Sequence, residues 1–250
     1  MRAALRHFAA TVLSVAFFAS AAASAAGVEV LFDLHDRTKT LFPSNLFTVF
    51  DFSQNTFRRV NLAKPDCTKN QIRCDDIDVL NKLDGFNVQP RLSIPFSGPI
   101  DVSTVGKDSV FLVSLGSTTG GGSFGDKVDI NQIVWDPASN TLFAESDELL
   151  EQHTRYALIV TDRVLDAQGH PVRPPRFNRR DHDDRDNDVV AGAARRHGSA
   201  RIVAASIFTT QSVTSTLEKV RDQIKASHPA PARFDVGSAG ERAVSRSPAW

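Results

Sequence analysis

The chain has 250 residues, of which 41% are hydrophobic, and its 29 basic residues equal its 29 acidic residues in number. A nucleic-acid-binding protein needs a basic face, so this balance argues against a nucleic-acid partner. The length suits one large domain, or one domain with appendages.

Residues 1–26 have the pattern of a signal peptide. Arg2 and Arg6 give a positive start, an apolar run covers 9–19, and the small residues at 23–26 fit a cleavage site. The apolar run is shorter than the roughly 20 residues that span a bilayer, although a retained signal anchor is the alternative. We therefore expect an exported protein, located in the periplasm, at the cell surface or outside the cell, with no transmembrane segment in its mature chain.

Residues 27–172 predict one β-domain built of short strands. Apolar residues alternate with polar ones, or fill short runs, at 91–97, 110–115, 128–135, 141–145 and 154–161, with turn residues at 136–140 and 166–169. Strands at this spacing, without long helices between them, predict an all-β fold and an antiparallel β-sandwich. Pro95 has no backbone N–H, so its strand is expected at an edge or a bulge.

Tyr156, the only tyrosine of the chain, stands at the start of the strand predicted over 154–161. Sandwiches often place a tyrosine at such a corner, where its hydroxyl bonds back to the upstream backbone. We expect this structural corner at Tyr156; an ordinary half-buried tyrosine is the alternative. Along the strand, Tyr156, Leu158 and Val160 share one face, and the residues between them share the other.

Two segments predict helices. Residues 76–83 space Ile77, Leu80 and Leu83 three apart behind an acidic start, with Gly85 as a stop. Residues 212–226 place four apolar residues on one stripe, and the charges around them alternate in sign. With a strand predicted over 201–210, the segment 201–226 is expected to complete the domain.

Three segments predict loops. Residues 116–125 are rich in glycine, serine and threonine, which is typical of a long hairpin tip. Residues 173–200 carry many charges and few large apolar side chains, so we expect a poorly ordered loop. Residues 227–250 are rich in proline, alanine and glycine and read as a disordered, linker-like tail.

The two cysteines, Cys67 and Cys74, are close in sequence and belong to the part expected to be exported. An even count and an oxidising destination favour a disulfide. Closing this loop would stabilise the fold by about 2.5 kcal/mol. Two unpaired thiols are the alternative, and no further cysteine or histidine pair stands at the spacing of a zinc site.

An acidic run at 181–188 contains the one candidate metal site. Asp184, Asp186 and Asp188 follow the alternating spacing of a calcium loop. The glycine of such a loop is replaced by Val189, however, and Arg195 stands where the bidentate glutamate would fall. We therefore expect a solvated acidic loop, with calcium as the weaker alternative and no cofactor.

No segment predicts a catalytic centre. Residues 116–122 form a glycine-rich loop, but no Lys-Ser/Thr and helix follow it, as a phosphate-binding loop requires. No Gly-x-Ser-x-Gly motif occurs, so no serine is a candidate nucleophile. Phe124, Trp135 and Phe143 could form a binding face for sugar or lipid, although aromatic residues of a sandwich are more often core.

Six segments in order along the chain carry a resemblance to a known family. They are Leu41-Phe-Pro-Ser-Asn-Leu-Phe47, Leu83-Asp-Gly-Phe-Asn87, Ile94-Pro-Phe-Ser-Gly-Pro-Ile-Asp101, Val134-Trp-Asp-Pro137, His153-Thr-Arg-Tyr-Ala157 and Ser206-Ile-Phe-Thr-Thr-Gln-Ser212. Together they resemble the N-terminal domain of the bacterial virulence-factor-type extracellular lipases, over 41–236. That domain is similar to bacterial Ig-like domains, so the resemblance implies an Ig-like sandwich.

In that family the sandwich precedes an α/β-hydrolase domain, which carries the serine nucleophile. The resemblance therefore implies an accessory domain of a lipase or esterase, with a hydrolase domain or a cell-surface component as its partner. No residue here matches the catalytic motif, so no enzymatic activity is carried over. Residues 234–244 resemble the interdomain linker, and we expect a gene product truncated before the hydrolase.

Two other functions remain open. One is a free-standing, adhesin-like or ligand-binding sandwich, and the other is a hydrolase with an unrecognised site. Ester hydrolysis by the purified protein would favour the latter, and saturable binding without hydrolysis would favour the former.

Overall fold

The computed structural model describes residues 27–33, 37–175, 192, 195–197 and 200–228. Its strands are β1 (Thr48–Phe50), β2 (Arg58–Val60), β3 (Arg91–Pro95), β4 (Val110–Ser117), β5 (Phe124–Val128), β6 (Ile130–Asp136), β7 (Thr141–Ser146), β8 (Thr154–Thr161) and β9 (Ile202–Thr209). Its α-helices are α1 (Gln71–Leu80) and α3 (Ser215–Ala226), and short 3-10 turns lie at Arg37–Lys39, Asn45–Phe47, Val102–Thr104 and Arg195–His197.

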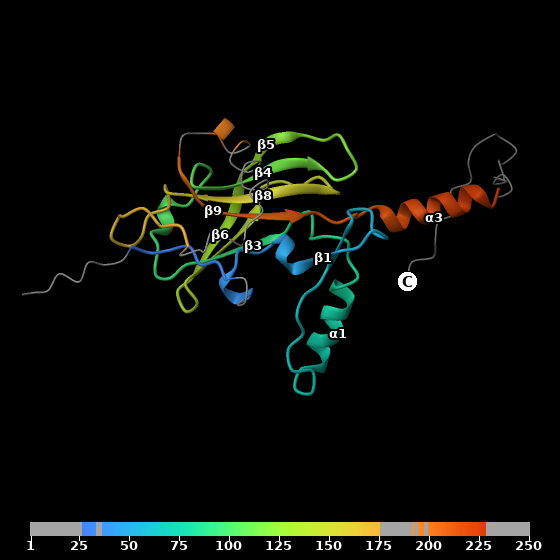
Figure 1. Ribbon diagram of the computed structural model, residues 1–250, viewed down its shortest axis with the longest axis horizontal. Helices are drawn as coiled ribbons and strands as arrows, with labels where there is room; N and C mark the ends of the chain where they lie inside the picture. Colours follow the sequence, from blue (N-terminus) through green and yellow to red (C-terminus); the bar gives the residue numbers. More distant parts are fainter. Residues whose placement is uncertain (1–26, 34–36, 176–191, 193–194, 198–199, 229–250) are drawn as a thin grey trace, which may run out of the picture.

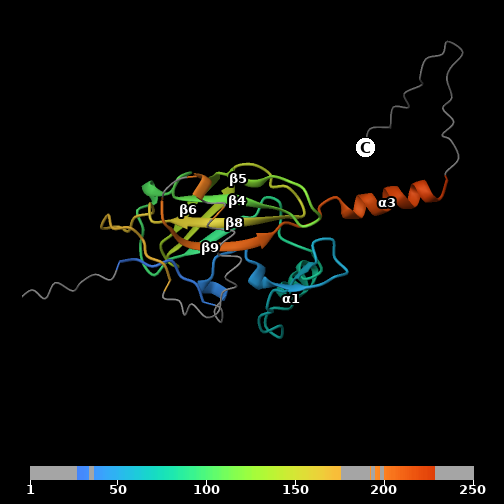
Figure 2. The same ribbon diagram turned by 45° about the horizontal axis from the view of Figure 1, so that its top comes forward.

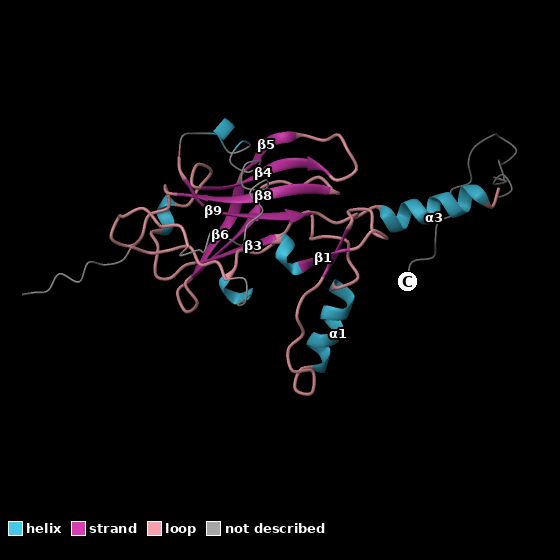
Figure 3. Cartoon of the chain, viewed as in Figure 1, coloured by secondary structure: helices cyan, strands magenta, loops and turns pink. Residues whose placement is uncertain are grey.

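The body of the molecule is a sandwich of two antiparallel sheets. One has the strand order β3-β7-β6 and the other β5-β4-β8-β9, and every pairing in them is antiparallel. Figure 3 shows these strands together in the body, with the two helices outside it. This confirms the predicted all-β, antiparallel sandwich with two helices.

The core lies between the two sheets. β3 and β7 contribute Leu92, Ile94 and Leu142 to it, and β4 and β8 contribute residues such as Leu112 and Leu158. All five side chains are buried, because the strands alternate their side chains between the two faces of each sheet.

Strands β4 and β8 are buried on their second face as well. As predicted, Tyr156, Leu158 and Val160 enter the core, whereas Ala157 and Ile159 join a second apolar cluster. Phe111, Val113 and Leu115 of β4 belong to that cluster. His197 lies against it, with its ring 6.4 Å from that of Phe111 and its Nε2 2.6 Å from the Gly125 carbonyl oxygen.

Residues 45–90 leave the sandwich and form what we call the side lobe. It contains the hairpin β1–β2, in which Phe50 pairs with Arg58, and helix α1. Figures 1 and 2 show the side lobe beside the sandwich, near the end from which α3 projects. The strand patterns did not predict β1 and β2, which have three residues each.

The strand predictions hold with small changes. The run predicted over 128–135 divides into β5, which begins at Phe124, and β6. Residues 118–123 connect β4 to β5, so the predicted hairpin tip is shorter than expected. Pro95 lies on β3, which is an edge strand of its sheet, as its missing donor requires.

Both predicted helices are present, with bounds that differ from those expected. Helix α1 covers Gln71–Leu80 rather than 76–83, because Cys74 and Ile77 form its buried side and Asn81, just beyond Leu80, is held by Leu62. Gly85 lies beyond the end of α1 and does not stop it. Helix α3 begins at Ser215 rather than 212, because the backbone N–H of Ser212 is bonded to Asp84.

The described residues contain no helix that is long and apolar enough to cross a membrane. Residues 1–26, most of the charged loop 173–200 and residues 229–250 lie outside the part of the chain that the structure describes.

Candidate docking site where β9 leaves the sandwich

The side lobe is fastened to the point where β9 passes into α3. The buried carboxylate of Asp84 accepts hydrogen bonds from the backbone N–H of Ser212, at 2.9 Å, and from its hydroxyl. Thr56, between β1 and β2, donates its hydroxyl to the carbonyl oxygen of Asp84. Three segments that are far apart in sequence therefore meet at the side chain and the backbone carbonyl group of Asp84.

Gly85 allows this close approach. A Cβ at this position would lie 2.7 Å from the Thr209 carbonyl oxygen and from the Gln211 nitrogen, both of them backbone atoms that cannot move aside. The next residue, Phe86, donates its backbone N–H to Thr209 and accepts one from Gln211, at 2.8 and 2.7 Å. The lobe thus joins the end of β9 through its backbone.

A pocket of about 370 Å³ lies between the side lobe and the edge of the sandwich. Its apolar lining includes Phe42, Val60, Leu62, Leu80, Leu83, Phe86 and Pro90, and its polar lining is Asn87, Gln89, Arg91, Glu145 and Gln211. This volume and this mostly apolar lining lie within the range of small-molecule sites. The pocket has room for an apolar molecule whose polar groups contact the amides of Asn87 and Gln89 or the charged side chains of Arg91 and Glu145.

Helix α3 carries a stripe that the fold leaves uncovered. Val213, two residues before α3, and Leu217, Val220 and Ile224 within it are between 45% and 72% exposed, and α3 buries no residue. The side chain of Gln152 holds its beginning through both donor and acceptor contacts with Thr214, between 3.0 and 3.2 Å. An amphipathic helix normally turns such a stripe toward a partner surface.

Tyr156 makes a bond of the kind expected at a tyrosine corner. Its hydroxyl accepts the backbone N–H of Glu151 at 3.0 Å, and its ring stacks on Phe208 with centroids 5.9 Å apart. Burial raises the pKa of Tyr156 above its usual value, although the bond from Glu151 acts in the opposite direction. The corner lies next to Gln152, so it supports the residue that holds α3.

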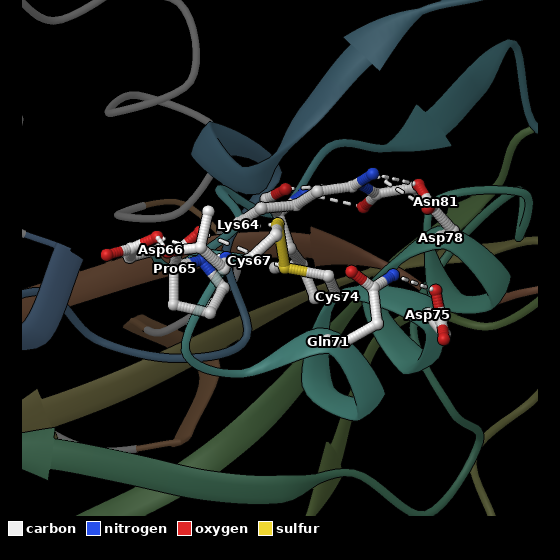
Figure 4. Close-up of a disulfide and its surroundings, with 11 residues drawn as sticks. Lys64, Pro65, Asp66, Cys67, Gln71, Cys74, Asp75, Asp78 and Asn81 are labelled. Carbon is white, nitrogen blue, oxygen red and sulfur yellow. Dashed lines mark hydrogen bonds and ion pairs between the residues drawn. A yellow bond between two sulfur atoms is a disulfide. The ribbon is translucent and has the colours of Figure 1, made fainter.

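Cys67 and Cys74 form a disulfide in the side lobe, with a Cα–Cα distance of 5.8 Å. Figure 4 shows the bond between the loop before α1 and the first turns of the helix. Lys64 pairs with Asp78 at 2.6 Å nearby, so a covalent and an ionic link join the same two segments. The disulfide lies in the lobe and not in the sandwich.

The other sequence-predicted candidates do not come together. Phe124 lies on β5, in a different sheet from Trp135 and Phe143. Trp135 pairs with Leu142 and packs toward the core, where its ring lies 6.1 Å from Phe96. Phe143 pairs with the exposed Val134 on the opposite face, so the three rings form no common surface.

The calcium candidates Asp184, Asp186 and Asp188 lie outside the described residues. Among the residues that are described, no group of three His, Cys, Asp or Glu side chains could hold a metal ion. The glycine-rich segment at 116–122 connects β4 to β5 as part of a hairpin, with Gly116, Gly120, Gly121 and Gly122 at positive φ.

Two features of the site had no usable sequence signal. The pairing of Asp84 with Ser212 spans 128 residues, and neither residue stands in a pattern that predicts the contact. The pocket forms only when the lobe folds back on β3.

A scan of protein-family models finds no match to this chain, and a search of curated proteins finds none either. Among solved structures, surface layer protein SbsC, domains 1-6, is 13% identical over 43% of this chain and 16% of its own, with a TM-score of 0.27. The S-layer protein rSbsC(31-844) is 11% identical over 68% of this chain and 18% of its own, with a TM-score of 0.30.

The N-terminal part of the bacterial S-layer protein SbsC is 12% identical over 42% of this chain and 26% of its own, with a TM-score of 0.27. The chain therefore spans about a quarter or less of each of these structures. At such identities and TM-scores, the likeness carries no argument about what this protein does.

Proposed function

We propose that this protein is a non-catalytic accessory domain of an exported, lipase- or esterase-type system, and that α3 docks a hydrolase domain. The observation that carries the proposal is the uncovered stripe of α3. A helix of 12 residues is marginal by itself in water, and tertiary packing of its apolar face normally stabilises it. Here that face meets solvent, so a partner surface is what the helix lacks.

The base of α3 is built to hold the helix in one direction. Ser212 is bonded to Asp84, and Thr214 is bonded to Gln152. Gln152 directly follows Glu151, whose backbone N–H is bonded to the Tyr156 hydroxyl. A helix fixed at its base presents its stripe in a defined orientation, which lowers the entropic cost of docking. The six resembling segments supply the class of the partner, an α/β-hydrolase domain.

The first test is an activity assay. The purified protein is expected not to hydrolyse a chromogenic acyl ester, and hydrolysis by the purified protein would overturn the proposal.

The second test measures binding of an α/β-hydrolase domain from a lipase of the resembling family, produced separately, to the purified protein. Leu217→Asp places a charge in the stripe and is expected to weaken binding at least tenfold, because the carboxylate must lose its water at the interface. Lys219→Asp adds the same side chain outside the stripe of the same helix and is the matched control. Equal affinities for the two variants would refute docking through the stripe.

The pocket favours a second candidate, a free-standing sandwich that binds a small apolar ligand. A fluorescent apolar dye tests it, with Leu83→Trp to fill the pocket and Val134→Trp, at an exposed site on β6, as control. Saturable dye binding that only Leu83→Trp removes would support this function; weak binding, equal in all three proteins, would exclude it.

A further inference from the structure

The tip of the β1–β2 hairpin exposes three phenylalanines within eight residues. Phe50 is 72% exposed, Phe52 83% and Phe57 46%. The Phe52 and Phe57 rings lie 6.5 Å apart, and the Arg58 guanidinium lies 4.5 Å from the centroid of the Phe50 ring. We call Phe50, Phe52 and Phe57 the aromatic tip.

Hydrogen bonds build the turn that carries the aromatic tip. Asp51 and Phe57 are joined by a backbone bond of 3.0 Å, and Gln54 bonds to both residues at 3.1 Å. The Asp51 carboxylate accepts the backbone N–H and the hydroxyl of Ser53, and it also pairs with Arg59 at 3.1 Å. The rings are thus displayed by an ordered turn.

The backbone conformation of Phe57 indicates that holding the rings in these positions costs conformational free energy. Its φ of 60° is in the left-handed region, which a bulky aromatic residue rarely adopts. Such conformations persist where the surroundings enforce them, and they gather at binding sites. The neighbouring Thr56 is buried and bonded to Asp84, so the side lobe fixes the base of the turn to the sandwich.

We propose that the aromatic tip inserts into a lipid–water interface. At such an interface apolar side chains enter the boundary between headgroups and acyl chains, while cationic groups remain among the phosphates. Phe50 and Arg58 have this arrangement, since they are cross-strand partners with the guanidinium over the ring. Arg59, on the same strand, is paired with Asp51, so Arg58 is the cation that lies against the Phe50 ring.

The size and shape of the tip favour lipid over a protein partner. Three phenylalanines exposed to this extent present roughly 400 Å², whereas a stable protein interface takes about 800 Å² from each partner. The tip is also a projecting turn, and a fluid lipid surface needs no matching pocket to accept it. This inference goes beyond the accessory role and does not depend on α3.

The test is co-sedimentation of the purified protein with phosphatidylcholine vesicles, with and without one fifth phosphatidylglycerol. Wild-type protein is expected to bind both, and Phe50→Ser/Phe52→Ser to lose at least tenfold in affinity for each. Phe124→Ser removes a phenylalanine of similar exposure to Phe57 from β5 and is expected to bind as wild type does. Unchanged binding by the double variant would overturn the proposal, as would wild-type binding only to the anionic vesicles.

A second measurement serves if the double variant fails to fold. The tryptophan fluorescence of Phe52→Trp is expected to be quenched by brominated lipid more than the fluorescence of the native tryptophans in wild-type protein. The fluorescence of Phe124→Trp is expected to show no such extra quenching. Equal quenching of the two variants would refute insertion of the tip. Loss of hydrolase binding by Phe50→Ser/Phe52→Ser, with vesicle binding intact, would assign the tip to a protein partner instead.

Discussion

Asp84 accepts both the backbone N–H and the hydroxyl of Ser212, and through this pair the side lobe is tied to the base of α3. Both residues are buried, so bulk water does not take the place of the carboxylate when Asp84 is replaced. Asp84→Ala leaves two donors of Ser212 unsatisfied and is expected to cost about 1–3 kcal/mol of unfolding free energy. Urea denaturation measures this loss.

Asp78→Ala is the matched control for that experiment. Asp78 is an exposed partner of Lys64, and an exposed ion pair contributes about 0–1 kcal/mol. If both substitutions cost the same, the buried pair has no special role in holding the lobe. Hydrogen exchange at residues 210–214 should also accelerate in Asp84→Ala and not in the control.

Tyr156→Phe removes only the hydroxyl that accepts the Glu151 N–H. We expect a loss of about 1 kcal/mol, the usual net contribution of a hydrogen bond, because the ring continues to pack on Phe208. Thermal or chemical unfolding gives the value. No loss of stability would show that water replaces the bond without cost.

The ionisation of Tyr156 should occur above pH 10, because burial raises its pKa. Tyr156 is the only tyrosine, so phenolate absorbance reports this one group. A raised pKa in the folded state means that the contribution of Tyr156 to stability is complete below about pH 10. It is then lost as the pH rises through the pKa of the folded state, and Tyr156→Phe should lack this alkaline loss.

Asp166 should make stability sensitive to acid. Burial alone would raise the pKa of this carboxyl, but the backbone N–H groups of His170 and Gln168 and the charge of His170 outweigh burial and lower it. The contribution of Asp166 is therefore complete above about pH 4 and is lost as the pH falls through its lowered pKa. Melting temperatures of wild type and Asp166→Asn between pH 2 and 6 should converge toward the acid end.

Replacing both cysteines by alanine should act locally. The disulfide closes a short loop and joins it to α1, so its removal should cost about 2.5 kcal/mol. Because the bond lies in the side lobe, proteolysis should increase within residues 62–82, while the strands of the sandwich stay protected. Equal loss of protection in β4 and β8 would show that the lobe and the sandwich unfold together.

Periodicity along single strands was sufficient to predict much of the sandwich. The run at 154–161 alternates Tyr156, Leu158 and Val160 with Ala157 and Ile159, and the two sets lie on opposite faces of β8 as the pleat demands. The same reasoning placed Pro95 on an edge strand. Patterns of this kind depend on neighbours one or two residues away, and the amino-acid sequence records those directly.

Only the tertiary structure decided the path of the chain where it leaves β9 and the contacts that the side lobe makes there. Asp84 and Ser212 are 128 residues apart, and the turn at Phe57 requires a backbone conformation that the residue itself disfavours. Helix α1 begins five residues earlier than its acidic residues suggest, because the side that it buries contains Cys74 and Ile77. The sequence by itself determined the strands and their buried faces, since these follow from local alternation. Long-range contacts produce the pocket, the uncovered stripe of α3 and the aromatic tip, and local patterns do not encode such contacts.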